Sequence, residues 1–575
     1  LHSTSRRQRQ MCIRDRAYQV DSIIKDNKGF YFLKSFEIPQ LELKIAFSID
    51  EARDKVTAEL TGTAKELINE SDYTYKWYTL DISGLTATEI KGETATILTE
   101  LVEGQEYKLI ATNSNNAELT REGKFVYKAE RKVIYVDYTA GLDTNDGLTR
   151  ATPVKTLSVA YTKLSSTGTV NTNIIVIMKD YTGIAFNTSS LLSAKNGKAA
   201  TITGAYDGQD EGGTLLLSGG TAGRFISGDT NFENLTFYGS AHTTGTGSVD
   251  LYVQGHKVKF GSNIIMDRYI KNGTLPDFDI YGGWRKPNEQ YSVAANTPTI
   301  EINSGQFNKI IMGNGMGTNA VSNLQNTTSN NIMGSSSASF GGTVTVDYIG
   351  KMKQEDIGLI AGGNEIGTIY SNAIINIKNG NVGKIIGGNY ADSSNRPTSW
   401  AYPLNTFIGT STINITGGQI ENIIGASYGR NVNGTTIKSD AYYYGTINIK
   451  ISGGTINSDI YGAGVGSTTG YNTNSSDAYK SYGANVTTST NINISGGTIK
   501  GNVYGGGYAY SENLTEAQQQ LDSGALYGNS NVIVNGSPTI NGDIYGSGKG
   551  YNYSTVPNNS KMIGNTTVSY THLTL

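Results

Sequence analysis

Two stretches in the C-terminal half of this chain carry nearly the same phrase. Ile492–Ile499 reads INISGGTI and is followed by Val503–Gly507, which reads VYGGG. Ile449–Ile456 reads IKISGGTI and is followed by Ile460–Gly462, which reads IYG. A phrase that recurs at a short period is typical of solenoids and propellers. It predicts a long repetitive surface on which any binding or chemistry must lie.

Seven copies of this phrase occur between about residues 299 and 548, and their spacing varies while the phrase is kept. The phrase is therefore the structural unit, and the variation lies in the loops between units. We predict that the second apolar residue of each copy points inward and stacks with its equivalents in one aliphatic ladder. These residues are Ile302, Val346, Ile377, Ile415, Ile451, Ile494 and Val534.

Each phrase predicts three very short strands. The I-x-I segment alternates apolar and polar residues, which is the period of a half-buried strand. The Gly-Gly pair that follows suits a sharp turn with positive φ. A short strand such as Thr498–Ile499 comes next, and a second turn leads to a last strand, Asn502–Tyr504. Three such strands describe one coil of a parallel β-helix, with the variable loops leaving from one corner.

A second landmark precedes the repeats. Val133–Asp137 reads as a strand, Gly141–Gly147 as a turn, and Leu157–Tyr161 as a short amphipathic helix that follows Pro153. This order resembles the entry of right-handed parallel β-helix proteins of the pectin-lyase-like superfamily. The resemblance implies a β-helix over residues 131–568: an entry strand and capping helix at 131–164, irregular coils at 165–298 and regular repeats at 299–568. The phrase is also similar to repeats of large bacterial surface proteins.

A β-propeller is the alternative fold. Propeller blades need four strands each and an even repeat. The phrase here holds only short strands, its spacing swings widely, and Trp77, Trp284 and Trp400 do not share a repeated place. We therefore predict an all-β chain built on a right-handed parallel β-helix.

The region 17–130 carries no repeat. Tyr73–Tyr78, Thr94–Leu98 and Tyr107–Ala111 alternate as strands do. These segments resemble bacterial immunoglobulin-like modules, in which a tryptophan on a central strand packs the sandwich; Trp77 matches that place. The resemblance implies a small β-sandwich that serves as a spacer.

The two ends differ from the rest of the chain. Residues 1–16 hold five arginines and the single cysteine, Cys12, and residues 569–575 interrupt what reads as the start of another coil. Both ends resemble translated sequencing-adaptor sequence, the alternative being a natural basic leader and tail. We expect an artefactual leader and tail that pack against nothing, on a protein that is longer on both sides.

The composition limits the possible binding partners and the cellular location of the protein. The formal net charge is −3, and it becomes more negative without the arginine-rich leader, which argues against a nucleic-acid partner. No apolar run reaches the length of a transmembrane helix. Apart from Cys12 the chain has no cysteine, so disulfides play no part. We expect a monomer located outside the cell or on the surface of a bacterium.

Catalysis is the competing functional class, because the superfamily includes polysaccharide lyases and glycoside hydrolases. Lyases need a basic residue and clustered calcium ligands, and hydrolases need paired carboxylates. Residues 431–568 contain no arginine or histidine, and Asn502 separates the equivalent positions Asp459 and Asp543, which favours turn capping. In the early coils, Asp207, Asp210 and Glu211 lie in one loop. The residues that could face a shared groove are Asp229, Glu233, Asp267, Arg268, Asp277 and Arg285.

We predict no catalytic residue, no metal site and no cofactor. Asp143–Gly147 resembles a calcium loop, so a structural calcium ion is the alternative. Its glycine stands one place too early, and no glutamate follows at the proper distance. An Asx-rich turn is the favoured interpretation.

The 37 tyrosines are the strongest hint of a binding surface. Many of them stand in the segments that we interpret as loops, and Tyr, Asn, Ser and Gly are favoured in adaptable binding surfaces. The alternative is that each tyrosine stacks on its copy in the next coil. We predict a non-catalytic, adhesin-like stalk that binds a cell-surface glycan or host surface. The binding residues are Tyr442, Tyr443, Tyr444, Tyr471, Tyr482, Tyr508 and Tyr510.

Overall fold

The computed structural model divides the chain into two compact units, Leu1–Arg131 and Lys132–Leu575. Each unit is described by itself. The residues that the structure describes are 18–25, 31–38, 42–49, 55–81, 86–91, 95–99, 101–102, 105–127, 131–178, 198–217, 224–226, 228–239, 249–267, 278–283, 298–313, 342–349, 357–365, 369–391, 405–430, 441–469, 486, 488–512, 524–553, 556–558 and 562–571.

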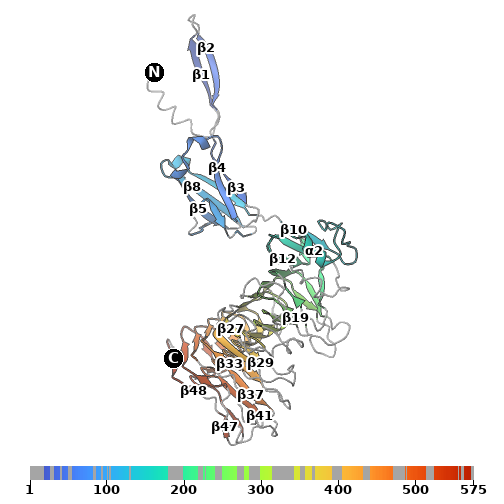
Figure 1. The fold of residues 1–575 in the computed structure, drawn as a ribbon. Helices are drawn as coiled ribbons and strands as arrows, with labels where there is room; N and C mark the ends of the chain where they lie inside the picture. The colour runs from blue at the N-terminus through green and yellow to red at the C-terminus, as the bar shows by residue number, and fades with distance from the viewer. Residues whose placement is uncertain are drawn as a thin grey trace. The chain divides into compact units, whose positions relative to one another are not determined.

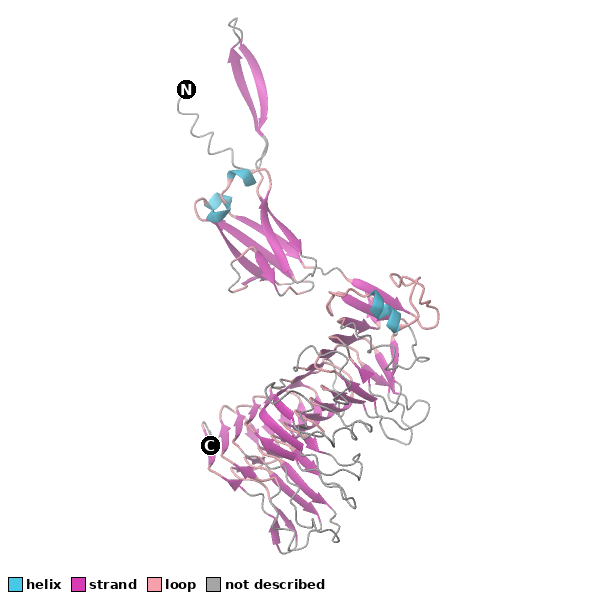
Figure 2. Cartoon of the chain, in the orientation of Figure 1, coloured by secondary structure: helices cyan, strands magenta, loops and turns pink. Residues whose placement is uncertain are grey.

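The first unit contains an antiparallel β-sandwich of a three-stranded and a four-stranded sheet (Figure 2). Trp77 lies fully buried between the sheets, against Val56 and Leu98 of one sheet and Leu109 of the other, as its predicted packing role requires. The strands are β3 (Lys44–Ile49), β4 (Lys55–Thr61) and β7 (Ile97–Thr99), then β6 (Ala87–Glu89), β5 (Tyr73–Leu80), β8 (Glu106–Asn113) and β9 (Arg121–Val126).

Three short 3-10 helices lie in the connections of the sandwich: η1 (Lys65–Leu67), η2 (Glu70–Asp72) and η3 (Ala117–Leu119). Residues 17–41 do not join its sheets in the described part of the chain. There, β1 (Tyr18–Lys25) and β2 (Tyr31–Ile38) pair only with each other, as an antiparallel hairpin.

The second unit is a parallel β-helix, in which each coil pairs with the next coil in parallel register (Figure 1). This pairing confirms the predicted fold class and excludes a ring of antiparallel blades. The first long sheet consists of β10 (Lys132–Val136), β11 (Asn173–Ile177), β12 (Ala200–Thr203), β17 (Thr230–Glu233), β20 (Lys257–Phe260), β23 (Thr299–Ile302), β25 (Thr343–Asp347), β27 (Ile369–Asn379), β30 (Asn405–Ile415), β33 (Ala441–Tyr444), β34 (Ile447–Ile451), β38 (Thr490–Ile494), β43 (Ser530–Val534) and β49 (Thr566–Tyr570).

The predicted aliphatic ladder runs through the first long sheet. Ile302 pairs with Val346, and the same register continues coil by coil through Ile494 to Val534. The first six ladder residues are almost fully buried, and Val534 is partly buried. The alternation of the I-x-I segment therefore identified the inward face correctly.

The second long sheet shows that one detail of the predicted coil is wrong. Gln419–Ile424 is one continuous strand that pairs with both short strands of the next phrase, so these two strands share one sheet rather than two. The sheet consists of β16 (Arg224–Phe225), β19 (Val249–Tyr252), β22 (Phe278–Tyr281), β24 (Phe307–Ile311), β26 (Ile357–Ala361), β28 (Asn381–Ile386), β31 (Gln419–Ile424), β35 (Thr455–Ile456), β36 (Ile460–Tyr461), β39 (Thr498–Ile499), β40 (Val503–Tyr504), β44 (Thr539–Ile540) and β45 (Ile544–Tyr545).

The third face of the later coils follows the second glycine cluster of the phrase. It is a short sheet of β29 (Tyr390–Ala391), β32 (Tyr428–Arg430), β37 (Val465–Thr469) and β41 (Tyr508–Glu512). The remaining pairings are β15 (Thr214–Leu217), β18 (Thr236–Gly239) and β21 (Ile265–Asp267) in one parallel sheet, the parallel pair β42 (Leu526–Tyr527) and β48 (Met562–Ile563), and the hairpins β13 (Ala205–Tyr206) with β14 (Gln209–Asp210) and β46 (Tyr551–Tyr553) with β47 (Val556–Asn558).

The corner between the two long sheets depends on glycine. Gly454 and Gly497, the second glycines of their pairs, have φ of +79° and +83°. Residues other than glycine adopt such φ angles only at an energetic cost, because their Cβ atom crowds the backbone. The Gly-Gly pair of the phrase therefore fixes this turn, as predicted.

The entry of the β-helix also follows the sequence. Helix α2 (Leu157–Lys163) begins at Thr156, whose hydroxyl accepts a hydrogen bond from Val159 N. Its residues Leu157 and Ala160 are buried in the main apolar core.

The C-terminal end of the chain corrects a prediction. Ser569–Thr571 do not lie outside the coils, because β49 pairs with β43 and Thr571 N donates a hydrogen bond to the carbonyl of Val534. Residues 1–16 and 572–575 lie outside the described residues.

Candidate functional site

The outward side of the first long sheet carries a column of amide and hydroxyl side chains. Inward residues of strands such as β34 and β38 are buried, so the residues that alternate with them face away from the core. Six consecutive strands each contribute one of these partly exposed side chains, which together we call the amide face. They are Thr345, Asn376, Asn414, Asn448, Asn491 and Asn531.

The amides of this face are hydrogen-bonded from coil to coil. Asn491 Nδ2 donates to Asn448 Oδ1 at 3.1 Å, and Asn531 Nδ2 donates to Asn491 Oδ1 at 3.1 Å. In the neighbouring row, Asn414 Nδ2 donates to Asn376 Oδ1 at 2.9 Å. An amide has two N–H donors and two lone pairs on its oxygen. Each ladder bond uses one donor and one lone pair, so every amide keeps hydrogen-bonding capacity for a ligand.

The later coils of this face carry little charge. Lys450 and Asn493 are exposed beside the amide ladder, and the outward residues Ile374 and Ile533 are each 38% exposed. Amides, hydroxyls and small apolar areas therefore alternate on a nearly neutral surface. Such a surface suits a neutral polar ligand better than a polyanion.

The predicted tyrosine cluster 442–444 does not lie in a loop, because these residues form strand β33 beside β30. Tyr442 and Tyr444 point outward; Tyr442 is partly exposed and Tyr444 is 45% exposed. Tyr443 points inward, is fully buried, and stacks on Phe407 with ring centroids 4.7 Å apart. Its hydroxyl donates to Thr446 O at 3.1 Å, so Tyr443 belongs to the core and cannot contact a ligand.

The other predicted binding tyrosines divide into two groups. Tyr508 lies at the start of β41 and stacks on Tyr461, with ring centroids 5.2 Å apart. Tyr510 lies in the same strand, with its side chain outside the described part, and Tyr471 and Tyr482 lie wholly outside it. The binding role of all these tyrosines stays a prediction.

A tyrosine ladder that the sequence interpretation did not single out runs along the second long sheet. Tyr461, Tyr504 and Tyr545 occupy the same place in successive phrases and stack at 5.5 and 4.9 Å between ring centroids. Tyr461 and Tyr504 are buried, so their rings stabilise the coil rather than offer a free face. The repeated tyrosine of the phrase was the signal for this ladder, and stacking between copies is the interpretation that it supports.

The equivalent positions Asp459, Asn502 and Asp543 cap successive turns, as predicted. Asn502 N donates to Asp459 Oδ1, and Asp543 N donates to Asn502 Oδ1, both at 2.8 Å. Burial opposes ionisation of Asp459, but hydrogen bonds from Lys549, Asn502 N and Tyr461 lower its pKa overall. These carboxylates therefore serve the structure of the coil.

A buried ionic cluster lies on the second long sheet among the early coils. Lys309 Nζ lies 3.1 Å from Asp279 Oδ2 and 2.7 Å from Glu365 Oε1. The hydroxyl of Tyr281 lies 3.2 Å from Glu365 Oε2, and Asn308 Nδ2 donates to Asp279 Oδ1 at 2.9 Å. Three separate segments thus meet in one polar cluster, which the sequence interpretation missed.

The cluster contains an ionisable group that titrates near neutral pH. Burial raises the pKa of Asp279 to about 7, with Lys309 opposing the shift and Glu365 reinforcing it. Burial alone would lower the pKa of Lys309, but the two carboxylates raise it overall. A carboxyl group of this kind can act as a general acid or base. However, Asp279 is only 3% exposed, which hinders access by a polymeric substrate.

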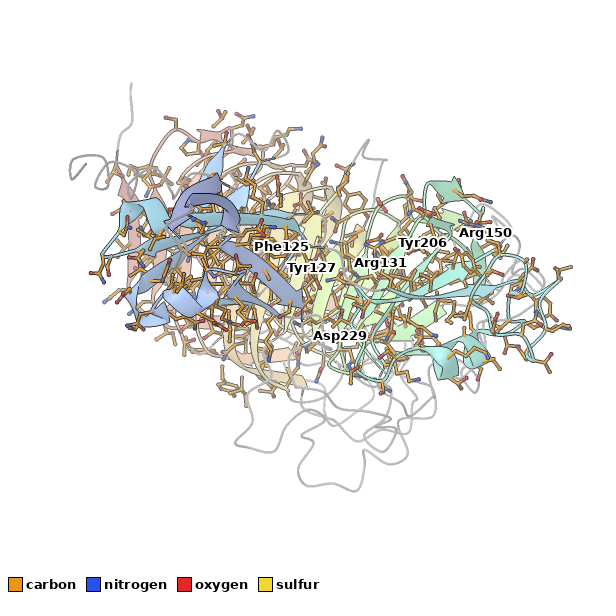
Figure 3. All side chains as sticks on the ribbon, turned by 90° about the horizontal axis from the view of Figure 1, so that it is seen from above. Phe125, Tyr127, Arg131, Arg150, Tyr206 and Asp229 are labelled. Atoms are coloured by element: carbon orange, nitrogen blue, oxygen red, sulfur yellow. The ribbon has the colours of Figure 1, made fainter. Side chains whose placement is uncertain are left out.

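Of the six residues predicted to share a groove, only Asp229 and Glu233 have described side chains, and Glu211 of the neighbouring acidic loop is bound to Arg150. Arg150 binds Glu211 Oε1 through Nε at 2.5 Å and donates to the carbonyl of Tyr206 at 2.8 Å. Asp229 lies apart from Arg150 and Tyr206 (Figure 3), where its carboxylate accepts from Lys257 N at 2.9 Å. The side chain of Asp267 and residues Arg268, Asp277 and Arg285 lie outside the described part.

The calcium-like loop uses its carboxylates within the turn. Asp143 Oδ1 accepts from Thr156 N at 2.8 Å and from Lys155 N at 3.1 Å, and Asp146 Oδ1 accepts from Thr152 Oγ1 at 2.7 Å. These bonds tie the turn to the start of helix α2, as an Asx-rich turn does. Among the described residues, no three His, Cys, Asp or Glu side chains gather in a metal-binding arrangement.

No family model, curated protein or solved structure matches this chain. None of the helices in the described segments has the length and apolar character needed to cross a membrane. The fold class is a parallel β-helix, preceded in the chain by a β-sandwich.

Proposed function

We propose that this chain is a non-catalytic, exported bacterial surface protein, an adhesin-like stalk that binds glycans through its amide face. The observation that carries this proposal is the set of partly exposed amide and hydroxyl side chains on six consecutive strands, hydrogen-bonded along each row. Each amide retains a donor and an acceptor for sugar hydroxyl groups. The outward rings of Tyr442 and Tyr444 add aromatic surface on the same sheet.

Repetition supports binding that would be weak at any single coil. Each coil supplies the same polar groups, so a ligand held at one coil meets the next at high effective concentration. The sandwich fits the spacer role of the immunoglobulin-like modules that it resembles, and the coils resemble repeats of bacterial surface proteins. On this proposal the protein is a monomer outside the cell or on its surface, and its partner is a glycan or host surface.

A glycan array and a cell-binding assay with the whole chain test the proposal. Asn491→Ala and Tyr444→Ala should each reduce binding at least threefold while the melting temperature stays within a few degrees, because both side chains are partly exposed. Asn541→Ala is the matched control, since Asn541 is exposed in the turn between β44 and β45. Equal binding by the parent and both face variants would favour a purely structural spacer instead.

A carbohydrate-active enzyme is the second candidate function, and the buried cluster around Asp279 is the observation that favours it. Asp279 and Glu365 are paired carboxylates on a β-helix, and one of them titrates near neutral pH. The test is release of reducing ends or unsaturated products from a polysaccharide panel. Activity that Asp279→Asn abolishes would replace the stalk proposal; we expect no product from the parent chain.

A further inference from the structure

The arrangement of the amide face narrows the class of glycan that it would recognise. The six side chains occupy two adjacent rows: Thr345, Asn376 and Asn414 form one, and the ladder from Asn448 to Asn531 forms the other. Within each row, successive groups are one strand spacing apart, about 4.8 Å. The rows are offset by two residues along the strand, about 7 Å.

The direction of the ladder is the direction of the solenoid axis. Asn531 donates to Asn491 and Asn491 donates to Asn448, so the bonded amides point the same way in successive coils. Their remaining donors and acceptors therefore repeat with one orientation and one spacing. A ligand complementary to this pattern must itself be a linear polymer with a similar repeat.

We propose that the amide face binds a neutral, extended, β-1,4-linked polysaccharide lying along the solenoid axis, with one sugar residue over each coil. An extended β-1,4-linked chain advances by roughly one strand spacing per sugar, so its sugars keep step with the coils. Successive sugars are turned over, so one edge of the chain presents the same group to every second amide of the ladder. Its equatorial hydroxyl or acetamido groups lie at the edges of a flat ribbon. This inference rests on the proposed glycan-binding function and names its ligand class.

Charge favours a neutral polymer over a polyuronate. The outward groups of strands β27 to β43 include amides, hydroxyls and the single exposed cation Lys450 in these two rows. Polyanion binding requires several basic groups that neutralise successive charges along the ligand. The exposed faces of Ile374 and Ile533 suit instead the apolar faces of pyranose rings.

Linkage geometry distinguishes this ligand from other neutral glycans. An α-1,4-linked glucan coils into a helix, so its hydroxyl groups do not fall at a constant spacing along a straight line. Such a chain would reach only a few of the six coils at once. The face should therefore discriminate by linkage as well as by charge.

The experiment is a titration of the whole chain with oligosaccharides of defined length. Binding is measured by calorimetry or by chemical-shift changes. The probes are β-1,4-linked glucose and N-acetylglucosamine oligomers of two, four and six residues, with maltohexaose as the α-linked comparison. We expect affinity to rise at least tenfold from dimer to hexamer in one β-linked series. Maltohexaose should bind at least tenfold more weakly than the hexamer of that series.

The second part of the experiment interrupts the amide ladder by a substitution at its middle residue, Asn491. Asn491→Ala should lower hexamer affinity to about that of the dimer, whereas Asn541→Ala should leave the length dependence unchanged. Glycan binding without length or linkage dependence would overturn this inference and leave the proposed function standing. Absence of binding to every oligosaccharide and to the glycan array would overturn both. A preference for polyuronates would contradict the neutral ligand class.

Discussion

Lys549 Nζ lies 2.7 Å from Asp459 Oδ2, although the two residues are 90 positions apart in the chain. The coil that carries Tyr504 lies between them. The same ammonium group lies 5.1 Å from the ring centroid of Tyr508 and 5.6 Å from that of Tyr504. One side chain thus connects coils that do not pair directly through their backbones.

Replacing Lys549 by methionine should lower the free energy of unfolding by about 1 kcal/mol, because an ion pair and cation–π contacts are lost while the aliphatic stem is kept. The measurement is denaturant unfolding of the parent, Lys549→Met, Asp459→Asn and the double variant. Additive effects would show that the two groups do not interact in solution. Lys500→Met, an exposed lysine in a turn, serves as the control.

The aliphatic ladder should be the most sensitive part of the β-helix. Ile494 is fully buried in its middle, and truncation to alanine should cost about 3 kcal/mol through lost burial and the cavity that remains. Asn493→Ala, at the exposed neighbouring position, should change stability by less than about 0.5 kcal/mol. Both values come from chemical denaturation, and similar effects at the two positions would contradict the assigned inward face.

Alanine substitutions at the adjacent residues Tyr443 and Tyr444 of β33 should differ strongly in their effect on stability. Tyr443→Ala should destabilise the β-helix by about 3 kcal/mol or more, because a buried ring stacked on Phe407 is removed. Tyr444→Ala should have little effect on stability, since its side chain is 45% exposed. Thermal unfolding of the two variants checks this prediction. Equal destabilisation would mean that β33 does not alternate as described.

The ionic cluster should make stability depend on pH. The pKa of Asp279 is raised from 3.8 to about 7, so folding takes up a proton between these values. The contribution of Asp279 to stability is therefore greatest below about pH 4 and is lost progressively as the pH rises to about 7. Above that pH the contribution should be constant.

Unfolding free energies measured from pH 4 to pH 8 test this dependence. Asp279→Asn should flatten the part of the curve that falls towards pH 7, because the amide does not titrate. Asp347→Asn is the comparison, since Asp347 is an exposed acid that pairs with Lys378. A parent curve that rises steadily over this interval, unchanged by Asp279→Asn, would contradict the raised pKa.

Local pattern was enough to predict the coil but not its lateral contacts. The inward place of Ile494 follows from alternation within five residues, and the turn at Gly497 follows from the demand for positive φ. Tyr443 was misplaced because three consecutive tyrosines carry no alternation of polarity. Its burial is decided by Phe407, a residue of the preceding coil.

The amide face and the ionic cluster illustrate the same limit at longer range. Asn491 directly precedes the I-x-I segment of its phrase, yet its partners Asn448 and Asn531 are fixed by register between coils whose loops differ in length. Asp279 and Glu365 both reach Lys309 for the same reason, although they are 86 positions apart in the chain. Spacing in the sequence cannot reveal such pairs until the coil boundaries are known.

The constant corner between the two long sheets has a consequence for how this chain can change length. Gly454 and Gly497 stand at the same offset from the inward isoleucines of their coils. Each of these two coils thus carries its own turn, its own rung of the core and its own outward amide. Duplication or loss of one whole coil would leave every remaining register intact. Recombination between the repeats could therefore lengthen or shorten the molecule in unit steps. Long connections follow the third sheet, as between β37 and β38, but one also joins the two long sheets, from β25 to β26.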